Sequence, residues 1–358
     1  MSFNIEKIKN VLVLMPDKHM GNLVVSLPAI NALKEYFKGN TFYLLVDKAY
    51  EEIVESLEPN NIILYPRKQL DGSPLIKRLA TLYKFFCKLR GSTPDLAIDL
   101  EGRSTSSIIT YLSGASLRIG KSTAKRPYFY NLKVTPLREK HKVHSYREIA
   151  SAVGVRNEIG IYRIRSSESK RTALKSILLK EGITIEKPII CIHPGAGKIY
   201  KQWTVEGFGE ISEWLAAEGF QVVFVGGTGD LEGINNIMTL LKHHSYNLGG
   251  KLSLGELMAL FEISSLYIGN DSGPMHLAGA VGIPVIALFG PADEGRWGPL
   301  SEKSIALRGE EPCEKCTGRD CQYEFKCIKT LSAKDVKVAI RSLFNTKKEH
   351  AWGKSMRS

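Results

Sequence analysis

Residues 266–299 constrain the fold of this chain most strongly, because they specify four consecutive structural elements with almost no residues between them. Residues 266–268 predict a short strand, and 269–273 predict a turn of small and amide residues. A short helix is expected from Pro274, and the wholly apolar run 285–289 is typical of a buried parallel strand. Elements in this order predict an α/β domain with a parallel sheet.

The start of the predicted helix favours an anion. Pro274 suits the first helical turn, where its missing N–H costs nothing, so Ser272 or Gly273 is expected at the N-cap. The backbone N–H groups of Gly273, Met275 and His276 then lack helical partners, beside the positive end of the helix dipole. The alternative is an ordinary turn that caps an ordinary helix. The later FGP and RWGP segments favour the first interpretation, a diphosphate site that is half of a nucleotide site.

A chain of 358 residues is long enough for two domains of ordinary size. Its hydrophobic content of 43% and charged content of 24% are typical of a globular protein. The apolar runs 23–30 and 281–289 are interrupted by proline and are shorter than the ~20 residues that a membrane-spanning helix needs. The N-terminus lacks the cleavage pattern of a signal peptide, so we expect a cytoplasmic protein.

The formal net charge of +12 favours an acidic partner. Eight basic residues and a single acid, Glu139, lie between positions 116 and 142. The basic residues are Arg118, Lys121, Lys125, Arg126, Lys133, Arg138, Lys140 and Lys142. Nucleic acid, an anionic membrane face or a phosphorylated glycolipid would each suit this stretch. A solvated surface with surplus lysine is the alternative for any single residue.

Two successive α/β halves are predicted from hydrophobic periodicity and turn residues. In the first half, strands are expected at 10–15, 41–46, 62–65 and 96–100, and helices at 23–36 and 75–89. In the second half, before residue 266, strands are expected at 189–193 and 221–225, and helices at 169–181, 206–218, 231–241 and 253–261. Such alternation predicts parallel sheets joined by crossover helices.

The stretch 158–169 has little periodicity and is predicted to link two domains, 1–163 and 164–330. Apolar residues recur at helical spacing within 331–345, behind a serine cap, which predicts a C-terminal helix. The charged, glycine-containing tail 346–358 is expected to be disordered.

Each half has a strand that runs into a glycine-containing loop. Gly21 lies at the mouth of the first predicted helix, where a bound group can approach the backbone closely. Gly195, Gly197, Lys198 and Lys201 follow a buried strand of the second half, and lysines there are well placed to neutralise a departing phosphate. This second loop matches neither a P-loop nor a GxGxxG fingerprint, so it is weak evidence alone. Together with 266–299 it supports a phosphate site.

A third loop follows the strand at 221–225. It contains Gly226, Gly227 and Thr228, and Glu232 lies in the first turn of the next helix. A carboxylate there can accept hydrogen bonds from ribose hydroxyls, as acidic residues do in other nucleotide folds. It can equally be an acid that complements the helix dipole, and the sequence leaves both roles open.

Several segments together resemble glycosyltransferase family 9, the ADP-heptose:lipopolysaccharide heptosyltransferases, along nearly the whole chain. They are VLVLMPDKHMGNLVVSLPAI, DLAIDLEG, IHPGAGKIYKQWTVEGF, VVFVGGTGD, NDSGPMHLAGAVGIPVIALFGP with RWGP, and CEKCTGRDCQYEFKCIKTLSAKDV. The NDSGPMHLAGA block is the most specific. The resemblance implies a GT-B fold, with two Rossmann-like domains whose parallel sheets face each other across a cleft, and inversion at the anomeric carbon without a metal. It places the nucleotide sugar mainly on the second domain and the acceptor lipid mainly on the first.

The resemblance also implies roles for individual residues. Lys201 resembles the lysine that contacts donor phosphate, and Glu232 resembles the acid that holds the ribose of the donor. The loop around phosphate and sugar is matched by Asp271, Ser272, Gly273 and His276. The whole set expected to bind the donor is Gly195, Lys198, Lys201, Thr228, Glu232, Asp271, Ser272, Gly273, Met275 and His276.

One position departs from the family pattern. Members commonly have Gly-Asp in the first glycine loop, with the aspartate as general base, whereas this chain has Gly21-Asn22, and a neutral amide cannot accept a proton. Asp17 and His19 are the nearest substitutes in this loop, which is one residue longer than the commonest pattern. Asp17 can equally cap a turn after Pro16, and His19 can equally be a surface residue. The residues expected in catalysis are Asp17, His19, Asn22 and Lys201.

Six cysteines allow a metal hypothesis. Cys87 and Cys191 lie in apolar surroundings and are expected to be buried thiols. The other four have the spacing C-x2-C-x4-C-x5-C, which can hold zinc or an iron–sulfur cluster, and they are Cys313, Cys316, Cys321 and Cys327. Similar cysteines recur in relatives without an implied catalytic role, so a structural metal stays an alternative and a catalytic metal is not expected.

The resemblance therefore implies an inverting glycosyltransferase that moves heptose, or a related sugar, from an ADP-sugar to a lipopolysaccharide inner-core precursor at the cytoplasmic membrane face. The acceptor is expected at Gly21, Arg118, Lys121 and Arg126. No cofactor beyond the substrates and no nucleic-acid partner is expected, and the oligomeric state is left open. The alternatives are a family member with another donor or acceptor, and a sugar-nucleotide-binding protein that has lost turnover. A nucleic-acid-binding protein lacks a recognisable reading motif.

Overall fold

The computed structural model describes residues 7–59, 61–137, 141–156, 162–309, 321 and 324–345. The chain divides into two compact units, Met1–Tyr162 and Arg163–Ser358, here the first and the second unit. Each unit is built on a six-stranded sheet. No helix within the described ranges is long and apolar enough to cross a membrane. The predicted α/β class with two parallel sheets is confirmed.

The first unit has the strand order β3-β2-β1-β4-β5-β6, and every neighbouring pair is parallel. Its strands are β1 (Asn10–Met15), β2 (Thr41–Asp47), β3 (Asn61–Tyr65), β4 (Leu96–Asp99), β5 (Leu117–Lys121) and β6 (Leu132–Val134). Its helices are α1 (Met20–Tyr36), α2 (Glu51–Glu55), α3 (Arg67–Leu70), α4 (Leu75–Gly91), α5 (Ser104–Leu112) and α6 (Lys142–Ser151), with short 3-10 helices η2 (Lys48–Tyr50) and η3 (Pro127–Phe129).

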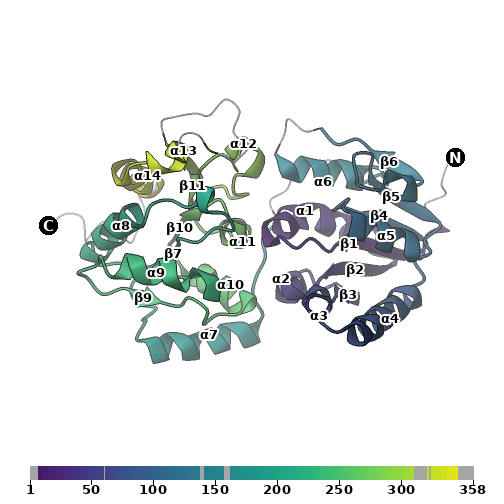
Figure 1. Ribbon diagram of the computed structural model, residues 1–358, viewed down its shortest axis with the longest axis horizontal. Coiled ribbons are helices and arrows are strands. Elements are labelled where there is room, and N and C mark those ends of the chain that lie inside the picture. Colours follow the sequence, from purple (N-terminus) through teal and green to yellow (C-terminus); the bar gives the residue numbers. More distant parts are fainter. Residues whose placement is uncertain are drawn as a thin grey trace. The chain divides into compact units, whose positions relative to one another are not determined.

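Helices cover both faces of the first sheet (Figure 1). The crossovers β1-α1-β2 and β4-α5-β5 run in opposite directions along the sheet, so right-handed connections place α1 and α5 on opposite faces. On one face, α4 and α5 bury Phe85, Leu89 and Ile109 against Leu12 and Leu45. On the other face, α1 packs against α6.

The second unit repeats this topology, with the order β12-β11-β10-β7-β8-β9 and parallel pairing throughout. Its strands are β7 (Ile189–His193), β8 (Gln221–Phe224), β9 (Tyr246–Asn247), β10 (Leu266–Asn270), β11 (Val285–Phe289) and β12 (Ser304–Arg308). Its helices are α7 (Glu168–Glu181), α8 (Val205–Ala217), α9 (Leu231–Met238), α10 (Leu254–Ile263), α11 (Gly273–Val281), α12 (Glu294–Trp297), α13 (Lys326–Lys329) and α14 (Ala333–Asn345), with η4 (Ile199–Lys201) and η5 (Thr228–Asp230).

The C-terminal helix belongs to the second unit. Val336 and Ile340 of α14 are buried in the same cluster as Phe208 and Ile211 of α8. The helix predicted within 331–345 is therefore confirmed. The tail 346–358 lies outside the described residues.

Every strand and helix predicted from periodicity is present, with shifts of a few residues at the ends. The turn predicted at 269–273 is shorter than expected, because β10 continues to Asn270 and α11 begins at Gly273. The periodicity analysis does not predict α5, β5, α6, the short helices α2, α3, α12 and α13, or the edge strands β6, β9 and β12. Edge strands are only partly buried, so their sequences carry a weak apolar signal.

Candidate functional site

Both sheets have the strand order of a Rossmann fold, whose ligands bind beyond the carboxyl ends of the strands where the order reverses. In the first unit the reversal lies between β1 and β4, and the loops there begin at Pro16 and Leu100. In the second unit it lies between β7 and β10, and the loops begin at Pro194 and Asp271. Most of the residues predicted to be functional lie at these two edges.

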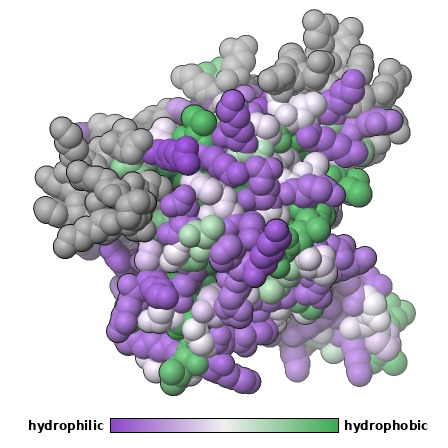
Figure 2. Space-filling view, turned by 90° about the vertical axis from the view of Figure 1, so that its left-hand side faces the viewer, coloured by the Kyte–Doolittle hydropathy of each residue, from purple (hydrophilic) through white to green (hydrophobic). Residues whose placement is uncertain are grey.

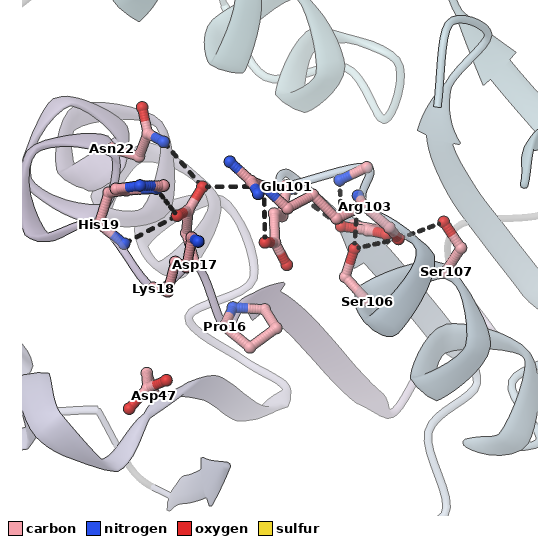
Figure 3. A network of polar contacts seen from close by, with 12 residues as sticks. Pro16, Asp17, Lys18, His19, Asn22, Asp47, Glu101, Arg103, Ser106 and Ser107 are labelled. Atoms are coloured by element: carbon pink, nitrogen blue, oxygen red, sulfur yellow. Dashed lines mark hydrogen bonds and ion pairs between the residues drawn. The ribbon is translucent and has the colours of Figure 1, made fainter. Parts of the chain in front are cut away.

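Asp17 is the centre of a polar network at the edge of the first sheet (Figure 3). Its buried carboxylate accepts a hydrogen bond from the backbone N–H of His19 (2.8 Å) at Oδ1, which also lies 2.9 Å from His19 Nδ1. Asn22 Nδ2, from the first turn of α1, donates to Asp17 Oδ2 at 2.7 Å. The Asp17 carboxylate thus caps the turn after Pro16, which was one of the two predicted roles. The hydrogen bond from Asn22 also fixes its orientation.

The loop around Asp17 is supported from two neighbouring strands. Arg67, after β3, donates through Nη2 to the carbonyl of Pro16 (2.5 Å) and through Nε to Asp47 Oδ2 at the end of β2 (2.6 Å). The Tyr50 hydroxyl donates to the carbonyl of Lys18 at 2.6 Å. Burial raises the pKa of Tyr50 to about 12, so this hydroxyl keeps its proton at neutral pH. These contacts preorganise the loop before any ligand binds.

Glu101 is a functional candidate that the sequence analysis did not assign. It follows β4, its side chain is only 3% exposed, and Arg103 Nε lies 3.4 Å from Glu101 Oε1 and 3.8 Å from Asp17 Oδ2. Burial, with the charges of Asp17 and Asp99, raises the pKa of Glu101 to about 8. Its Oε2 atom has no hydrogen-bond partner in the part of the chain that the structure describes. A carboxyl kept protonated beside an aspartate is an arrangement common in active sites.

The signal for Glu101 was present in the sequence. The segment DLAIDLEG contains a buried strand, β4, and Glu101 is the second residue after it. Asp17 is likewise the second residue after its strand, β1. The strand order was needed to see that β4 lies beside β1.

Of the basic residues predicted to bind the acceptor, Lys121 and Arg118 lie at different positions along β5. Lys121 is buried at the carboxyl end of β5, where its Nζ donates to the carbonyl of Glu101 at 3.0 Å, so it joins the same edge. Arg118 lies three residues earlier and donates to the carbonyls of Phe129 (2.8 Å) and Ala115 (2.7 Å). The structure therefore brings Lys121, but not Arg118, to the loop that carries Glu101.

The remaining acceptor candidates are less constrained. Gly21 is in the first turn of α1, beside Asn22. Arg126 precedes η3 and donates to the Tyr128 hydroxyl at 3.0 Å. Of the basic run, Arg138 and Lys140 lie outside the described residues, together with Glu139.

In the second unit, Lys201 and Asp271 form an ion pair, with 2.5 Å between Nζ and Oδ2. Asp271 is buried, whereas Lys201 at the end of η4 is partly exposed. Asn270 supports this arrangement, because its side chain accepts from the N–H of Trp203 (3.0 Å) and donates to the carbonyl of Pro194 (2.7 Å). The loop after β7 is thus fixed to the end of β10.

A second polar chain passes through the same edge. Ser272, the N-cap residue of α11, lies 3.2 Å from His193 Nδ1, and His193 Nε2 lies 3.4 Å from Asp230 Oδ2. The hydrogen bond with His193 holds the pKa of Asp230 below its usual range. A Cβ on Gly195 would lie 2.0 Å from Asp230 Oδ1, so any other residue there would displace the Asp230 carboxylate. The sequence analysis did not assign roles to His193 or Asp230.

The other donor candidates surround these two contacts. Gly273 is the first residue of α11, and the buried Met275 and His276 follow in its first turn, so Met275 can meet a ligand only through its backbone. Thr228 in η5 and Glu232 in the first turn of α9 are both exposed. Lys198 and Gly197 are exposed in the loop before η4.

The cysteine hypothesis is only partly covered. Cys313 and Cys316 lie outside the described residues, whereas Cys321 accepts a hydrogen bond from the N–H of Phe325 and Cys327 is buried. Cys191 is buried as predicted, but Cys87 is exposed on α4, which corrects the expectation of a buried thiol there. The apolar neighbours of Cys87 in the sequence face the sheet, and Cys87 does not. Within the described ranges, no three His, Cys, Asp or Glu side chains are grouped to hold a metal ion.

Two Rossmann-type units in one chain, each with loops at the point where its strand order reverses, are the architecture of the GT-B class of glycosyltransferase folds. A family model described as glycosyltransferase family 9 (heptosyltransferase) matches residues 82–326, and the chain belongs to this family. The chain is similar to lipopolysaccharide heptosyltransferase 3 of Escherichia coli, with 25% identity over 331 residues, or 90% of this chain and 96% of that protein.

Two solved structures share the fold over nearly the whole chain. A glycosyl transferase family 9 protein from Veillonella parvula DSM 2008 has a TM-score of 0.86 at 22% identity, covering 95% of this chain and 98% of that one. The E. coli ADP-heptose lps heptosyltransferase II has a TM-score of 0.78 at 21% identity, covering 95% of this chain and 100% of that one.

Proposed function

We propose that this protein transfers heptose from ADP-heptose to the lipopolysaccharide inner core. Family membership supports sugar transfer, and the names of the similar proteins supply donor and acceptor. The observation that carries the proposal within this chain is the network around Asp17, which supplies a fixed carboxylate where the family aspartate is replaced by Asn22. The acceptor is lipid-linked, so we propose action at the cytoplasmic face of the inner membrane.

The donor binds the second unit in this proposal. The first turn of α11, with the positive end of the helix dipole, contacts the diphosphate in this proposal, and Lys201 adds a positive charge. Asp271 carries a negative charge that would repel a diphosphate, so its role is to position the Lys201 ammonium. In this proposal the exposed Glu232, in the first turn of α9, accepts hydrogen bonds from the ribose.

The acceptor binds the first unit, where Asp17 is the general base. Asp17 takes the proton of the acceptor hydroxyl while that oxygen bonds to the anomeric carbon. The bond from this carbon to the diphosphate oxygen breaks, and its electron pair leaves with ADP. A single displacement of this kind inverts the anomeric configuration. The Asn22 amide orients Asp17 by donating a hydrogen bond to it. Asn22 is therefore a positioning residue, at the place where the family commonly has the aspartate that accepts the proton.

Glu101 supports the base in its protonated form. A neutral carboxyl adds no negative charge next to Asp17, and its Oε2–H is available to donate a hydrogen bond to an incoming hydroxyl group. Lys121, held at the Glu101 carbonyl, and Gly21 are proposed to contact the acceptor at the same edge.

The test is a transfer assay with purified protein, ADP-heptose and a heptose-free core acceptor, scored by ADP release and product mass. Asp17→Asn should lower kcat roughly 10²- to 10⁴-fold and change donor affinity little. Asp71→Asn, an exposed aspartate of the same unit, is the matched control. His19→Gln tests whether the neighbouring imidazole shares the proton.

Two outcomes would contradict parts of this proposal. A wild-type protein that binds ADP-heptose but transfers no sugar would favour a binding protein that has lost turnover. Full activity in Asp17→Asn, with a rate increase in Asn22→Asp, would show that Asp17 only caps its turn.

A further inference from the structure

Helix α4 carries an apolar strip that the fold does not use. Leu75, Ile76, Leu79 and Tyr83 are 68%, 82%, 57% and 73% exposed. Leu75, Leu79 and Tyr83 are spaced four residues apart, and Ile76 lies three residues before Leu79, so all four share one face of the helix. These four residues are called the apolar strip.

The strip is unusual within its own unit. Helices α1 and α4 both have 17 residues, but α1 buries nine of them and α4 buries only Phe85 and Leu89. Those two pack on the sheet from the C-terminal half of α4, whereas the strip lies in its N-terminal half. By contrast, the side of the second unit shown in Figure 2 is mainly hydrophilic, with apolar residues in small separate groups.

The charged residues of α4 are all basic. The chain has no acidic residue between Asp71 and Asp95. In the same stretch, α4 carries five basic residues, Lys77, Arg78, Lys84, Lys88 and Arg90. Lys77 and Lys84, seven residues apart and both exposed, form a row beside the apolar strip. A helix with an exposed apolar face, basic flanks and no acids is typical of a helix that lies in a membrane surface.

The position of α4 connects this surface to the candidate site. The carboxyl end of β3 leads through α3 to Leu75, so the first turns of α4 start at the same edge of the sheet as the loop of Asp17. Arg67 of α3 contacts that loop directly, through the carbonyl of Pro16. A bilayer bound at the strip would therefore lie on the edge that bears the proposed acceptor site.

We propose that α4 docks this protein on an anionic lipid bilayer. The apolar strip inserts at the level of the acyl-chain boundary, and Lys77 and Lys84 lie among the anionic headgroups. The charge complementarity selects anionic lipid as the occupant, since a protein partner would need an acidic groove shaped to this helix. The biological meaning of docking depends on the proposed lipid-linked acceptor, but vesicle binding itself needs neither donor nor acceptor.

Flotation of the purified full-length protein with vesicles measures the binding. We expect binding to vesicles with 30% phosphatidylglycerol, weaker binding to pure phosphatidylcholine, and a decrease with added salt. The double variant Leu79→Gln, Tyr83→Gln should lose roughly tenfold or more in vesicle affinity. Lys77→Gln, Lys84→Gln should lose about fivefold for each lysine and become less sensitive to salt. Leu179→Gln, Ile185→Gln is the matched control, with two apolar residues of the second unit that are 84% and 69% exposed, and should bind like wild type.

Thermal unfolding and soluble-donor binding verify that each variant is folded, which separates lost docking from lost structure. The proposal is overturned if both α4 variants bind anionic vesicles like wild type, or if neutral vesicles bind as tightly as anionic ones. It is also overturned if wild type is a dimer in solution that the Leu79, Tyr83 variant converts to a monomer, because a second copy then covers the strip. Absence of sugar transfer, with docking intact, would count against the proposed function alone.

Discussion

Single side chains in both units act through neighbours that hold them. Asp17 is fixed by His19 and Asn22, and Lys201 is fixed by Asp271. Because one member of each arrangement is buried, removing its partner leaves a polar group without compensation. Substitutions at such pairs therefore change stability as well as function, and controls must separate the two.

Glu101→Gln should change how stability depends on pH. The pKa of Glu101 is raised from 4.5 to about 8, mainly by burial, so between these values the folded protein keeps a proton that the unfolded chain has lost. The free energy of unfolding of wild type therefore falls as the pH rises through this window, by up to a few kcal/mol. Glutamine cannot ionise, so the variant should gain stability relative to wild type between pH 5 and 9.

Urea unfolding at several pH values measures this difference, with the exposed Glu55→Gln as control. A stability difference between Glu101→Gln and wild type that stays constant from pH 5 to 9 would show that Glu101 ionises normally.

Lys201→Ala should weaken donor binding and destabilise the second unit. Loss of the ammonium removes a positive charge from the proposed diphosphate site, so we expect the affinity for ADP to fall roughly 10- to 100-fold. The buried Asp271 also loses its partner, which should cost roughly 1–3 kcal/mol of unfolding free energy. Calorimetric titration with ADP and urea unfolding measure the two effects. Adding Asp271→Asn to Lys201→Ala should restore stability but not affinity, and restored affinity would remove Lys201 from the donor site.

Elements are joined at the site by side chains that bridge a strand end to a neighbouring loop. Asn270 connects the end of β10 to the loop after β7 in this way, and Arg67 connects α3 to the loop after β1. Parallel strands make such bridges possible, because the carboxyl ends of consecutive strands lie at one edge of the sheet.

Asn270→Ala should loosen the loop that carries Lys201. The variant leaves the N–H of Trp203 and the carbonyl of Pro194 buried without partners, which should cost roughly 2–4 kcal/mol. ADP affinity should fall with it, since Lys201 is no longer preorganised. Asn236→Ala, on the exposed side of α9, serves as control. If Asn270→Ala is as stable as wild type, water has replaced the amide as the hydrogen-bond partner of the Trp203 N–H and the Pro194 carbonyl.

The whole molecule consists of two compact units with the same topology. In the proposed arrangement, ADP contacts only the second unit. At a concentration of 100 times its Kd, a ligand adds about 2.7 kcal/mol to the stability of what it binds.

Hydrogen exchange with and without ADP should therefore show strong protection in the loops after β7 and β10 and in α11, and little change in the loop after β1. Equal protection of the Asp17 loop would contradict the assignment of the donor to the second unit.

The sequence by itself determined the class of fold and the loops that are proposed to bind the donor. Periodicity is a local property, so β1, α1, β7 and the segment from β10 to β11 could be predicted from neighbouring residues alone. The start of α11 could likewise be predicted from the small residues and Pro274, because helix capping depends on residues within one helical turn. Predictions failed where the local signal was weak, as in the edge strands, or where a face was assigned from composition, as for Cys87.

Only the tertiary structure decided which residues meet. Glu101 lies 84 positions from Asp17 in the sequence, and the two become neighbours because β4 pairs with β1. His193 and Asp230 meet for the same reason, across β7 and β8. The pKa of Glu101 depends on burial and on charges brought in by other strands, and neither is written in the adjacent residues. The exposed face of α4 is likewise a property of the packed molecule, since its sequence alone reads as an ordinary amphipathic helix.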